Sequence, residues 1–492
     1  MLNVHLRIND SIAGKPTPVR LRISTPEGKT FAPLGRSVEF PTGRNEAVGG
    51  HLKLGSERWC YIDGACEIPL PAGIPLRVQA TKGPEYKPLD EMVTLGPGQL
   101  SLRFVIVREF NWRGLHYHPG DMRCHFLTPH AGLLEMMAED LDIANALAIP
   151  FTVLALDGNA YTTTPDLLAF CGQQPALSAP SGHAFAVNTM NAHPVLGKMG
   201  LLHSHRAVFP LTFGEPDATD DWSICDWCDQ CHRKGGLTVW VEAFERAGGL
   251  LGGEALVAAI LGKIDALEID PGPRSIPLLP WLYRLWNVGV WVPLVGGSGK
   301  DSNRTPLGAM RTYAHVTGEF SLREWIEAIR KGHTFVTSAP FVELEVNGRR
   351  HGETVDTDGA VTMTARAASL KHFEKLEIVA NGEVIASAPE EMTQLGTWSV
   401  VLERECILDE SSWVAARCVG KQGFAHTSPV KVRVKDQPPH RDEAAAAALR
   451  QLVKQICEWG KVHGQYSNEK RREQLLNRCA LAMGRLGTLD RF

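Results

Sequence analysis

The sequence predicts a multidomain protein that combines a central α/β domain with two all-β domains and a C-terminal pair of helices. Short alternating segments separated by Gly, Pro and Asn turns fill residues 1–109 and 341–436, a pattern typical of β-sandwiches. Between them, in residues 110–340, helical patterns alternate with short apolar strands. That alternation favours parallel strands with outer helices, arranged either as a barrel or as an open doubly wound sheet. A length of 492 residues agrees with several domains.

The flanking segments carry the clearest strand patterns. The N-terminal strands are predicted at VRLRIST, SVEF, CYIDGACEIPL, PLRVQATKG and LSLRFVIVREF. The second β-rich segment has N-G turns at 347–348 and 381–382, which are typical of hairpins. Residues 437–492 are predicted to form a helical tail that begins with the linker QPPHRDE, and two amphipathic stretches within residues 443–492 predict an antiparallel helix pair.

Within the central domain, each predicted helix leads into a strand. Apolar residues at 133, 137, 141, 144 and 147 predict a helix that runs through AGLLEMMAEDLDIANALA, followed by a buried strand at IPFTVLALDGN. The remaining predicted pairs are a helix over 220–234 before GLTVWVEAF, GEALVAAILGK before IDALEID, and LLPWLYRLWN before VGVWVPLVGG, with a last helix at SLREWIEAIRKG.

Composition and terminal signals limit the partners of the protein. The formal net charge is −4, so no broad basic surface is expected and nucleic acid is excluded as the main partner. The N-terminus lacks the pattern of a signal peptide. The most apolar stretch, residues 278–297, contains Arg284 and two prolines, so it is predicted to be a buried helix and strand rather than a membrane span. We therefore expect a cytoplasmic protein with no membrane partner; the sequence does not predict its oligomeric state.

Three of the eleven cysteines form a C-x-x-C-x-x-C run. Cys225, Cys228 and Cys231 precede His232, and one interpretation is a metal or cluster site. The segment also begins with acidic residues and ends with basic residues and glycine, which is typical of a helix. No second cysteine cluster lies at metal-ligand spacing, so a helix with buried free thiols is the favoured prediction.

Polar residues gather at the ends of the predicted central strands. Glu242 ends one strand, Glu268 and Asp270 end the next, and residues 298–303 follow a third. Because the carboxyl ends of parallel strands meet at one rim, these residues are expected to converge. Paired carboxylates could serve acid/base chemistry or bind a divalent ion, whereas each acid alone could simply stabilise the N-terminus of a following helix.

Histidines cluster in the same domain, and imidazole is a common ligand of zinc, iron and manganese. A lone histidine is more often structural, so about two to four of the eight are expected to reach the site. The eight are His116, His118, His125, His130, His183, His193, His203 and His205.

The segment GGSGKDS contains Lys300 but lacks the spacing of a phosphate-binding loop. We therefore expect no nucleotide site there. Lys300 is instead predicted to pair with Asp301 or to face an anionic substrate.

The order of these motifs resembles the CehA/McbA-like branch of the PHP (polymerase and histidinol phosphatase) metal-dependent hydrolases. The similarity covers roughly residues 40–435, with GPEYKPL in the first sandwich fitting as well, and GDMRCH at 120–125 resembles the family's G-D-x-H-x-H entry motif. It continues through MAEDLDIANAL, MGLLHSHRAVFPL, GGLTVWVEAF, IDALEID, GGSGKDS and LREWIEAIRKGHTFVTSAPFVELEVNG. The resemblance implies a distorted PHP-like β/α barrel in which divalent ions activate water to attack an ester or phosphoester.

The ligand set departs from the family pattern at three places. The family's H-x-H becomes Arg123-Cys124-His125, its D-x-H becomes Asp301-Ser302-Asn303, and Glu242 replaces a strand-end histidine. Arginine stays protonated and cannot ligate a metal. Arg123 could instead occupy the place of a lost ion, with its charge directed toward Glu242 or an anionic substrate.

The first functional hypothesis is a hydrolase with a reduced site that holds one Zn, Mn or Fe ion. The predicted metal ligands are His125, His193, His203, His205 and Asp301, and the predicted catalytic residues are Glu242, Glu268, Arg123 and Lys300. The second is a metal-free enzyme in which Glu242 and Glu268 act on a small or carbohydrate-like substrate, with Trp240, Trp281 or Trp291 available for stacking. The third is an inactive binding protein. Both catalytic hypotheses require His125, Glu242 and Asp301 to meet in one pocket.

Overall fold

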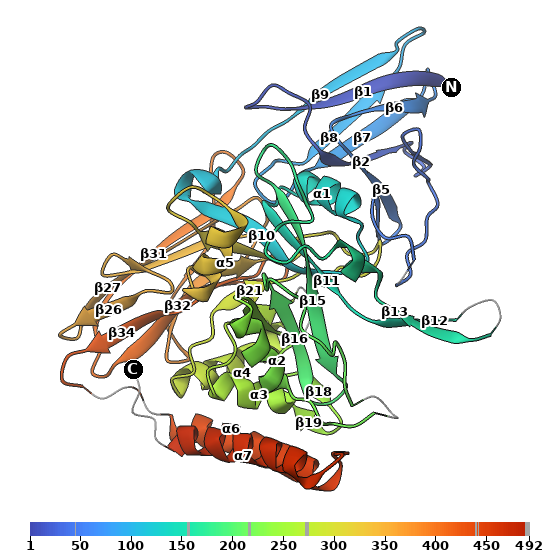
Figure 1. Ribbon diagram of the computed structural model, residues 1–492. Helices are drawn as coiled ribbons and strands as arrows, with labels where there is room; N and C mark the ends of the chain where they lie inside the picture. The colour runs from blue at the N-terminus through green and yellow to red at the C-terminus, as the bar shows by residue number, and fades with distance from the viewer. Residues whose placement is uncertain are drawn as a thin grey trace.

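The structure is a computed structural model that describes residues 1–44, 46–154, 158–214, 218–270, 275–437, 440 and 442–487. Strands make up 40% of the chain and helices 20%. Figure 1 shows the N-terminal sheets at one end, a long curled sheet in the middle that continues into the C-terminal sheets, and two long helices along the lower edge.

The N-terminal part consists of two sheets that enclose one apolar core. One has the order β6-β1-β9 and the other the order β4-β5-β2-β7-β8, with β3 paired to β2. Every second residue of β1 is buried, so Val4, Leu6 and Ile8 face the second sheet. The strands are β1 (Leu2–Asp10), β2 (Val19–Ser24), β3 (Thr30–Phe31), β4 (His51–Leu54), β5 (Glu57–Ile62), β6 (Ala65–Leu70), β7 (Pro75–Thr81), β8 (Leu89–Thr94) and β9 (Ser101–Ile106).

The central part is built on one half of a long sheet. Its strands are β10 (Tyr117–Cys124), β11 (Ile143–Ala148), β15 (Ala184–His193), β16 (Gly197–Leu202), β17 (Leu237–Val241), β20 (Ala266–Ile269), β21 (Leu294–Gly296), β22 (Arg311–His315) and β23 (Thr334–Thr337). Their order is β21-β20-β17-β16-β15-β11-β10-β22-β23. Shorter pieces are β12 (Phe151–Leu154), β13 (Ala160–Thr163), β14 (Leu177–Ser178), β18 (Arg246–Ala247), β19 (Leu250–Leu251) and the 3-10 turns η1 (Trp112–Leu115) and η2 (Pro165–Ala169).

The predicted fold class, with a central distorted β/α barrel, is wrong. In such a barrel, parallel strands alternate with helices all the way round. Here β16 runs antiparallel to both β15 and β17, and β22 runs antiparallel to β10. The sheet does not close; the 13 strands along its main hydrogen-bonded path form a curled half-barrel. Between helices α1 (Pro129–Ala138) and α2 (Ile224–Arg233), the described residues form strands and one 3-10 turn but no α-helix.

One predicted helix divides into a helix and a strand. Helix α1 begins after Thr128, whose hydroxyl accepts a hydrogen bond from the Ala131 N–H, and ends at Ala138. Asp140 then adopts a positive φ of 57°, and residues 143–148 form the fully buried strand β11. A short apolar run fits a buried strand as well as a helix, which explains the misassignment. The strand predicted after it is observed only as β12, half of an exposed hairpin with β13; residues 155–157 lie outside the described residues.

Helices α2, α3 (Gly253–Ile260), α4 (Ser275–Asn287) and α5 (Leu322–Arg330) confirm the predicted helices of the central part. The three cysteines of the C-x-x-C-x-x-C run lie buried on α2, where burial raises the pKa of each thiol. They pack in the largest apolar core, so this run forms the buried face of a helix.

The C-terminal part shares the long sheet. Strand β23 pairs with β33, and the sheet continues as β33-β32-β28-β29. Off this path, β34 pairs with β32, and β26 pairs with β34. A separate five-stranded sheet, β25-β24-β27-β31-β30, packs against this end around a second core. The strands are β24 (Phe341–Val346), β25 (Arg349–Arg350), β26 (Thr354–Thr357), β27 (Ala360–Ser369), β28 (Lys375–Ala380), β29 (Glu383–Pro389), β30 (Glu391–Met392), β31 (Trp398–Ile407), β32 (Ser412–Val419), β33 (Ala425–Thr427) and β34 (Val430–Val434).

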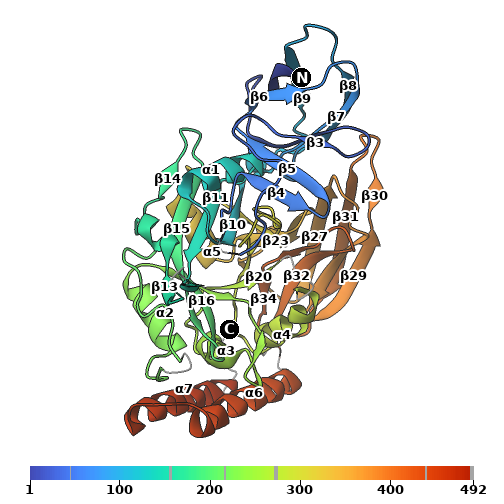
Figure 2. The same cartoon turned by 90° about the vertical axis from the view of Figure 1, so that its right-hand side faces the viewer.

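Helices α6 (Glu443–Val462) and α7 (Glu469–Gly487) pack against each other, as the sequence predicts. Figure 2 shows the pair lying below α3, and apolar side chains of α6 and α7 join the core formed by α2, α3 and α4. In the described part of the chain, no helix combines the length and the apolar character needed to cross a membrane.

Candidate functional site

Asp121 on β10 ties together the chain segments that form the base of the site. Its buried carboxylate accepts hydrogen bonds from the backbone N–H groups of Arg123, Ser298 and Gly308 at 2.9, 3.0 and 2.7 Å. Burial raises the Asp121 pKa, and the hydrogen bonds oppose that shift. The carboxylate therefore acts as a structural anchor. Sequence reasoning noted the G-D pair of the motif but gave Asp121 no role.

Arg123, two residues further along the same strand, joins two glutamates. Its Nε donates to Glu268 Oε1 at 2.8 Å, and its Nη1 donates to Glu242 Oε1 at 3.2 Å. Arg123 is 6% exposed and Glu268 is 3% exposed, so this contact is a buried ion pair. Burial alone would lower the Arg123 pKa, but Glu268 and Glu242 raise it overall. The guanidinium thus supplies a fixed positive charge between the two carboxylates.

The two glutamates have pKa values shifted in opposite directions. Burial raises the pKa of Glu268, although Arg123 acts against the shift. Burial acts in the same sense on Glu242, but Arg123 and Lys198 outweigh it and hold the Glu242 pKa at about 2. Lys198, on β16, binds the second oxygen of Glu242 and also donates to Glu245 at 2.9 Å. Divergent pKa values in neighbouring carboxylates are typical of acid/base sites.

The chain after β17 turns sharply and directs Glu242 into this cluster. Glu242 and Phe244 both have positive φ, at 49° and 56°, in a region that non-glycine residues rarely occupy. The Glu242 N–H also points toward Glu268 Oε2, at 3.4 Å. Strained backbone of this kind is often found at functional sites.

Gly297 makes the close approach of β21 possible. A Cβ placed there would lie 2.2 Å from Glu268 Oε1 and 3.1 Å from the Arg123 Cβ. Any side chain at this position would displace the carboxylate from Arg123. The glycine is therefore needed for the packing of the site, not for binding a phosphate.

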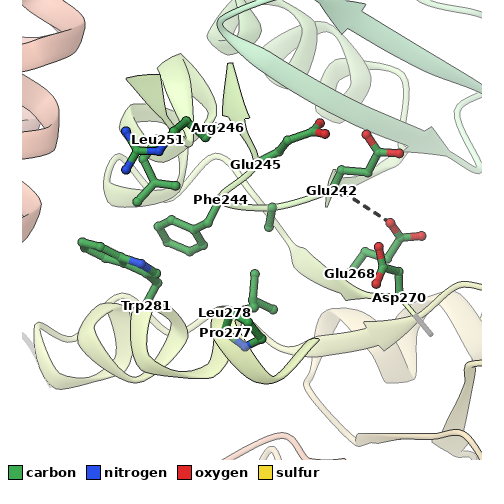
Figure 3. Close-up of a pocket in the computed structure, with 11 residues that line it drawn as sticks. Glu242, Phe244, Glu245, Arg246, Leu251, Glu268, Asp270, Pro277, Leu278 and Trp281 are labelled. Atoms are coloured by element: carbon green, nitrogen blue, oxygen red, sulfur yellow. Dashed lines mark hydrogen bonds between the residues drawn. The ribbon is translucent and has the colours of Figure 1, made fainter. Parts of the chain in front are cut away.

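A pocket of about 480 Å³ opens beside the glutamates. Figure 3 shows Glu242, Glu268 and Asp270 at one end and the rings of Phe244 and Trp281 at the other. The Phe244 and Trp281 rings are stacked with centroids 5.7 Å apart. The pocket thus combines a carboxylate-rich end with a flat aromatic wall. Of the three predicted stacking residues, Trp281 lines the pocket, whereas the side chain of Trp240 is buried in the core.

His125 and Asp301 lie near this cluster, but neither is among the residues that line the pocket, so the predicted meeting of His125, Glu242 and Asp301 in one pocket is not observed. His125 is buried, its Nδ1 contacts the Leu147 carbonyl oxygen at 2.7 Å, and both Asp301 and Glu242 act on it electrostatically. Burial, with a further contribution from Arg123, lowers the His125 pKa to about 4, so the ring is neutral at pH 7. Asp301 forms an ion pair with Arg44 at 2.6 Å.

Lys300 is placed in the interior and does not line the pocket. Its Nζ donates to the carbonyl oxygens of Ser302 and Thr305 at 3.1 and 3.0 Å and lies 3.4 Å from Glu135 Oε2. Asn303 is also held in place, because its side-chain amide forms hydrogen bonds with the backbone of Pro41, Ala47 and Gly49. Both side chains fix the loop after β21.

The other predicted ligand histidines do not join His125. Both ring nitrogens of His193 are occupied, Nε2 by Asp220 at 2.9 Å and Nδ1 by the backbone N–H groups of Val195 and Leu196. His205 Nδ1 contacts the Lys234 carbonyl oxygen at 2.9 Å. His203 lies near charges on and beside α5, including Glu327 and Arg323.

The residues at the end of β10 do not fit the metal centre that the resemblance implies. A guanidinium, which cannot ligate a metal, lies where Glu242 and Glu268 converge. Within the described ranges, no group of three His, Cys, Asp or Glu side chains is arranged to hold a metal ion. Sequence reasoning found Arg123, Glu242 and Glu268 but missed Lys198, Phe244 and Glu245; the acidic residue three positions after Glu242 was the available signal.

Comparisons with known proteins do not assign a family. No family model matches the chain, and no curated protein matches it. One solved structure, the crystal structure of an engineered protein, shares 11% sequence identity over 34% of this chain and 49% of its own, so the match spans about half of that structure's length. Its TM-score is 0.14, which is too low to relate the two folds.

Proposed function

We propose that the pocket beside Arg123 is the active site of a metal-independent enzyme that acts on a carbohydrate-like substrate. The observation that carries the proposal is the placement of Glu242 and Glu268 on one guanidinium, with pKa values shifted in opposite directions, at the end of a pocket with an aromatic wall. A single bridging guanidinium keeps the carboxyl groups within the roughly 5–10 Å typical of the carboxylate pairs of glycoside hydrolases.

The two carboxyl groups suit different steps of glycoside cleavage. Glu268 is the charged partner of Arg123 in the free site, but its raised pKa makes it the more readily protonated of the two carboxyl groups, so it is the one that can take up a proton and donate it to the leaving oxygen. Glu242 is ionised at neutral pH and is the group that faces the water or the anomeric carbon. In the hydrolysis of a glycosidic bond, the bond between the anomeric carbon and the leaving oxygen breaks as that oxygen takes the proton of Glu268, and water adds its oxygen to the anomeric carbon. Glu242 accepts the proton that water loses, and exchange with solvent returns a proton to Glu268.

The rest of the pocket suits a ring that is apolar on its faces and polar at its edge. The Trp281 ring offers an apolar surface, and carboxylate oxygens at the other end accept hydrogen bonds from hydroxyl groups. Asp270 and Glu245 line the same pocket and extend the acceptor surface.

A second candidate function is binding of the same ligand class without turnover. The low pKa of Glu242, about 2, favours it, because a carboxylate of such low basicity is a weak general base at neutral pH.

Turnover of a panel of chromogenic aryl glycosides, measured with and without EDTA, separates these functions from a metal-dependent hydrolase. We expect hydrolysis that EDTA leaves unchanged and that Glu268→Gln and Glu242→Gln each reduce at least about a hundredfold, the scale of general acid–base catalysis. Glu405→Gln, an exposed substitution on β31, is the control.

Measurements of sugar binding and of metal dependence distinguish the remaining outcomes. Saturable binding of a sugar that Trp281→Ala weakens, without turnover of any glycoside, would support the binding function. Activity that EDTA abolishes and added manganese or zinc restores would overturn the metal-independent proposal.

A further inference from the structure

A second, smaller pocket lies where the three parts of the chain meet. It has a volume of about 210 Å³ and is lined by Arg20 from β2, by Glu139 and Arg311 from the central part, and by Ser369 and Lys371 at the end of β27. It shares no lining residue with the pocket beside Glu242. Pockets at such junctions are frequent ligand sites.

Positive charge exceeds negative charge in this junction pocket. Its charged lining residues are Arg20, Arg311, Lys371 and Glu139, a formal sum of +2. The Glu139 carboxylate is already occupied, because its Oε1 accepts hydrogen bonds from Arg20 Nη1 and from the Tyr61 hydroxyl, both at 2.8 Å. Glu135, which also acts on Arg20, accepts from the Gly50 N–H and faces Lys300.

Arg311 is buried without a carboxylate to neutralise it. It is 4% exposed, and its Nε and Nη1 donate to the backbone carbonyl oxygens of Gly308 and Glu139, each at 3.0 Å. Over the described ranges, neither Arg311 nor Lys371 lies within 4.0 Å of a carboxylate oxygen. Buried charge without a counter-charge is costly.

Two further observations concern the cations that line this pocket. The Nε of Arg20 is buried and has no hydrogen-bond partner. Partial burial, and then the charges of Arg20 and Arg311, lower the Lys371 pKa, so both guanidinium groups lie close enough to the Lys371 ammonium to repel it. An anion between them would relieve both the repulsion and the unmet donor.

We propose that this junction pocket binds a small oxyanion, with inorganic phosphate or a phosphomonoester group as the ligand class. The pocket is smaller than the roughly 300–1,000 Å³ typical of sites for drug-sized ligands, which favours a group of phosphate size. Guanidinium groups match the oxygens of phosphate, and the exposed Lys371 at the mouth contributes a point charge. The bound anion joins the N-terminal, central and C-terminal parts. The proposal is independent of the function proposed for the pocket beside Arg123.

Calorimetric titration of the full-length protein with inorganic phosphate at constant ionic strength tests the proposal. We expect saturable 1:1 binding, weakened about tenfold by Lys371→Gln, the scale of one lost charge-assisted hydrogen bond. Arg311→Lys keeps the charge but loses the planar donors and is expected to weaken binding as well. Lys15→Gln, an exposed substitution in an N-terminal turn, should leave the affinity unchanged.

A thermal-unfolding series provides the second readout. Phosphate should raise the midpoint of the wild-type protein more than that of Lys371→Gln, because a ligand that binds only the folded state stabilises it. Acetate in place of phosphate distinguishes a general carboxylate site from one that prefers tetrahedral anions. Absence of saturable phosphate binding below about 20 mM, a concentration scale at which ligand affinity is only a few kcal/mol, would overturn the proposal. Equal affinity of the wild type and Lys371→Gln would overturn it too.

Discussion

Arg123 determines the chemistry that is possible at the end of β10. A histidine at this position could ligate a metal, whereas the guanidinium binds Glu268 and Glu242 directly. Glu268 is almost completely buried, so its negative charge depends on this partner. One residue thereby fixes the conformation of two carboxylates and the electrostatics of the pocket.

Arg123→Met should destabilise the protein strongly, because it leaves Glu268 buried without a counter-charge. We expect a loss of about 3–5 kcal/mol in the free energy of unfolding, measured by urea denaturation at pH 7. Adding Glu268→Gln should restore part of the loss, since the orphaned charge is then removed. Arg58→Met, which breaks a more exposed ion pair with Glu39, should cost about 1 kcal/mol or less. Equal costs for Arg123→Met and Arg58→Met would contradict the role given to Arg123.

The low pKa of Glu242 predicts a specific pH dependence of stability. The pKa is about 2 in the folded protein against an ordinary value of 4.5, so ionised Glu242 stabilises the fold above pH 4.5. That contribution is lost as the pH falls from 4.5 toward 2. The difference in unfolding free energy between the wild type and Glu242→Gln should therefore be constant from pH 7 to 6 and shrink at pH 4 and pH 3. Urea denaturation at each pH measures it; a difference that does not change at pH 3 would rule out the depressed pKa.

At the scale of elements, the contact between α6 and α7 contains a pair of interacting thiols. Cys457 on α6 is half-buried, and Cys479 on α7 is buried. The hydrogen bond from Cys479 lowers the pKa of Cys457 to about 7. The reactivity of Cys457 therefore reports on whether the two helices are packed together.

Alkylation by iodoacetamide should modify Cys457 with a pH midpoint near 7, because the thiolate is the reactive form. Cys479→Ser replaces the partner thiol, so the midpoint should rise toward the ordinary value for cysteine. Peptide mass mapping follows the modification, with the similarly half-buried Cys406 as an internal comparison. A midpoint that Cys479→Ser does not move would show that the helix contact does not activate Cys457.

The sequence placed several elements of the central part correctly. Helices α3 and α5 and strands β17 and β20 occur where the apolar pattern placed them. The pattern failed at residues 143–148, where a short fully apolar run forms strand β11. It also did not predict β16, whose antiparallel pairing depends on tertiary contacts with β15 and β17 rather than on local sequence.

At the scale of the whole molecule, the long sheet joins parts that the sequence predicted as separate. Strand β23 pairs with β33, and Trp413 on β32 donates from its Nε1 to Asn287 Oδ1 on α4 at 2.7 Å. The largest core contains residues from both sides of this junction, among them Val336 and Ala415. Turn signals and alternation identify strands but not which strands share a sheet, so the continuity could not be predicted.

Trp413→Ala should therefore destabilise the central and C-terminal parts together. The side chain is fully buried, so we expect a loss of about 3–5 kcal/mol. Hydrogen exchange followed by mass spectrometry should show that α4 and β32 lose protection to the same extent. Trp398→Ala, on the five-stranded sheet, should affect that sheet without a matching change in α4. Loss of protection confined to β32 after Trp413→Ala would indicate independent folding of the two parts.

The residues of the candidate site could likewise be predicted only in part from the sequence. The sequence predicted Glu242 and Glu268 at one strand rim because each ends a recognisable apolar strand, whereas Arg123 became a candidate only through the resemblance at GDMRCH. The structure places the three side chains in contact. The sequence also grouped His193, His203 and His205 with them by proximity in the chain. The rings of His193 and His205 are fixed elsewhere by Asp220 and the Lys234 carbonyl oxygen, and the backbone N–H of His203 donates to Asn188. Such partners are visible only in three dimensions.

The guanidinium at the end of β10 is synthesised with the polypeptide. A chelator cannot withdraw it, a scarce nutrient cannot limit it, and no other cation in the surroundings can replace it by mistake. The strength of the positive field that Glu242 and Glu268 experience is therefore the same in every copy of the folded chain, whatever the supply of trace elements where that copy works.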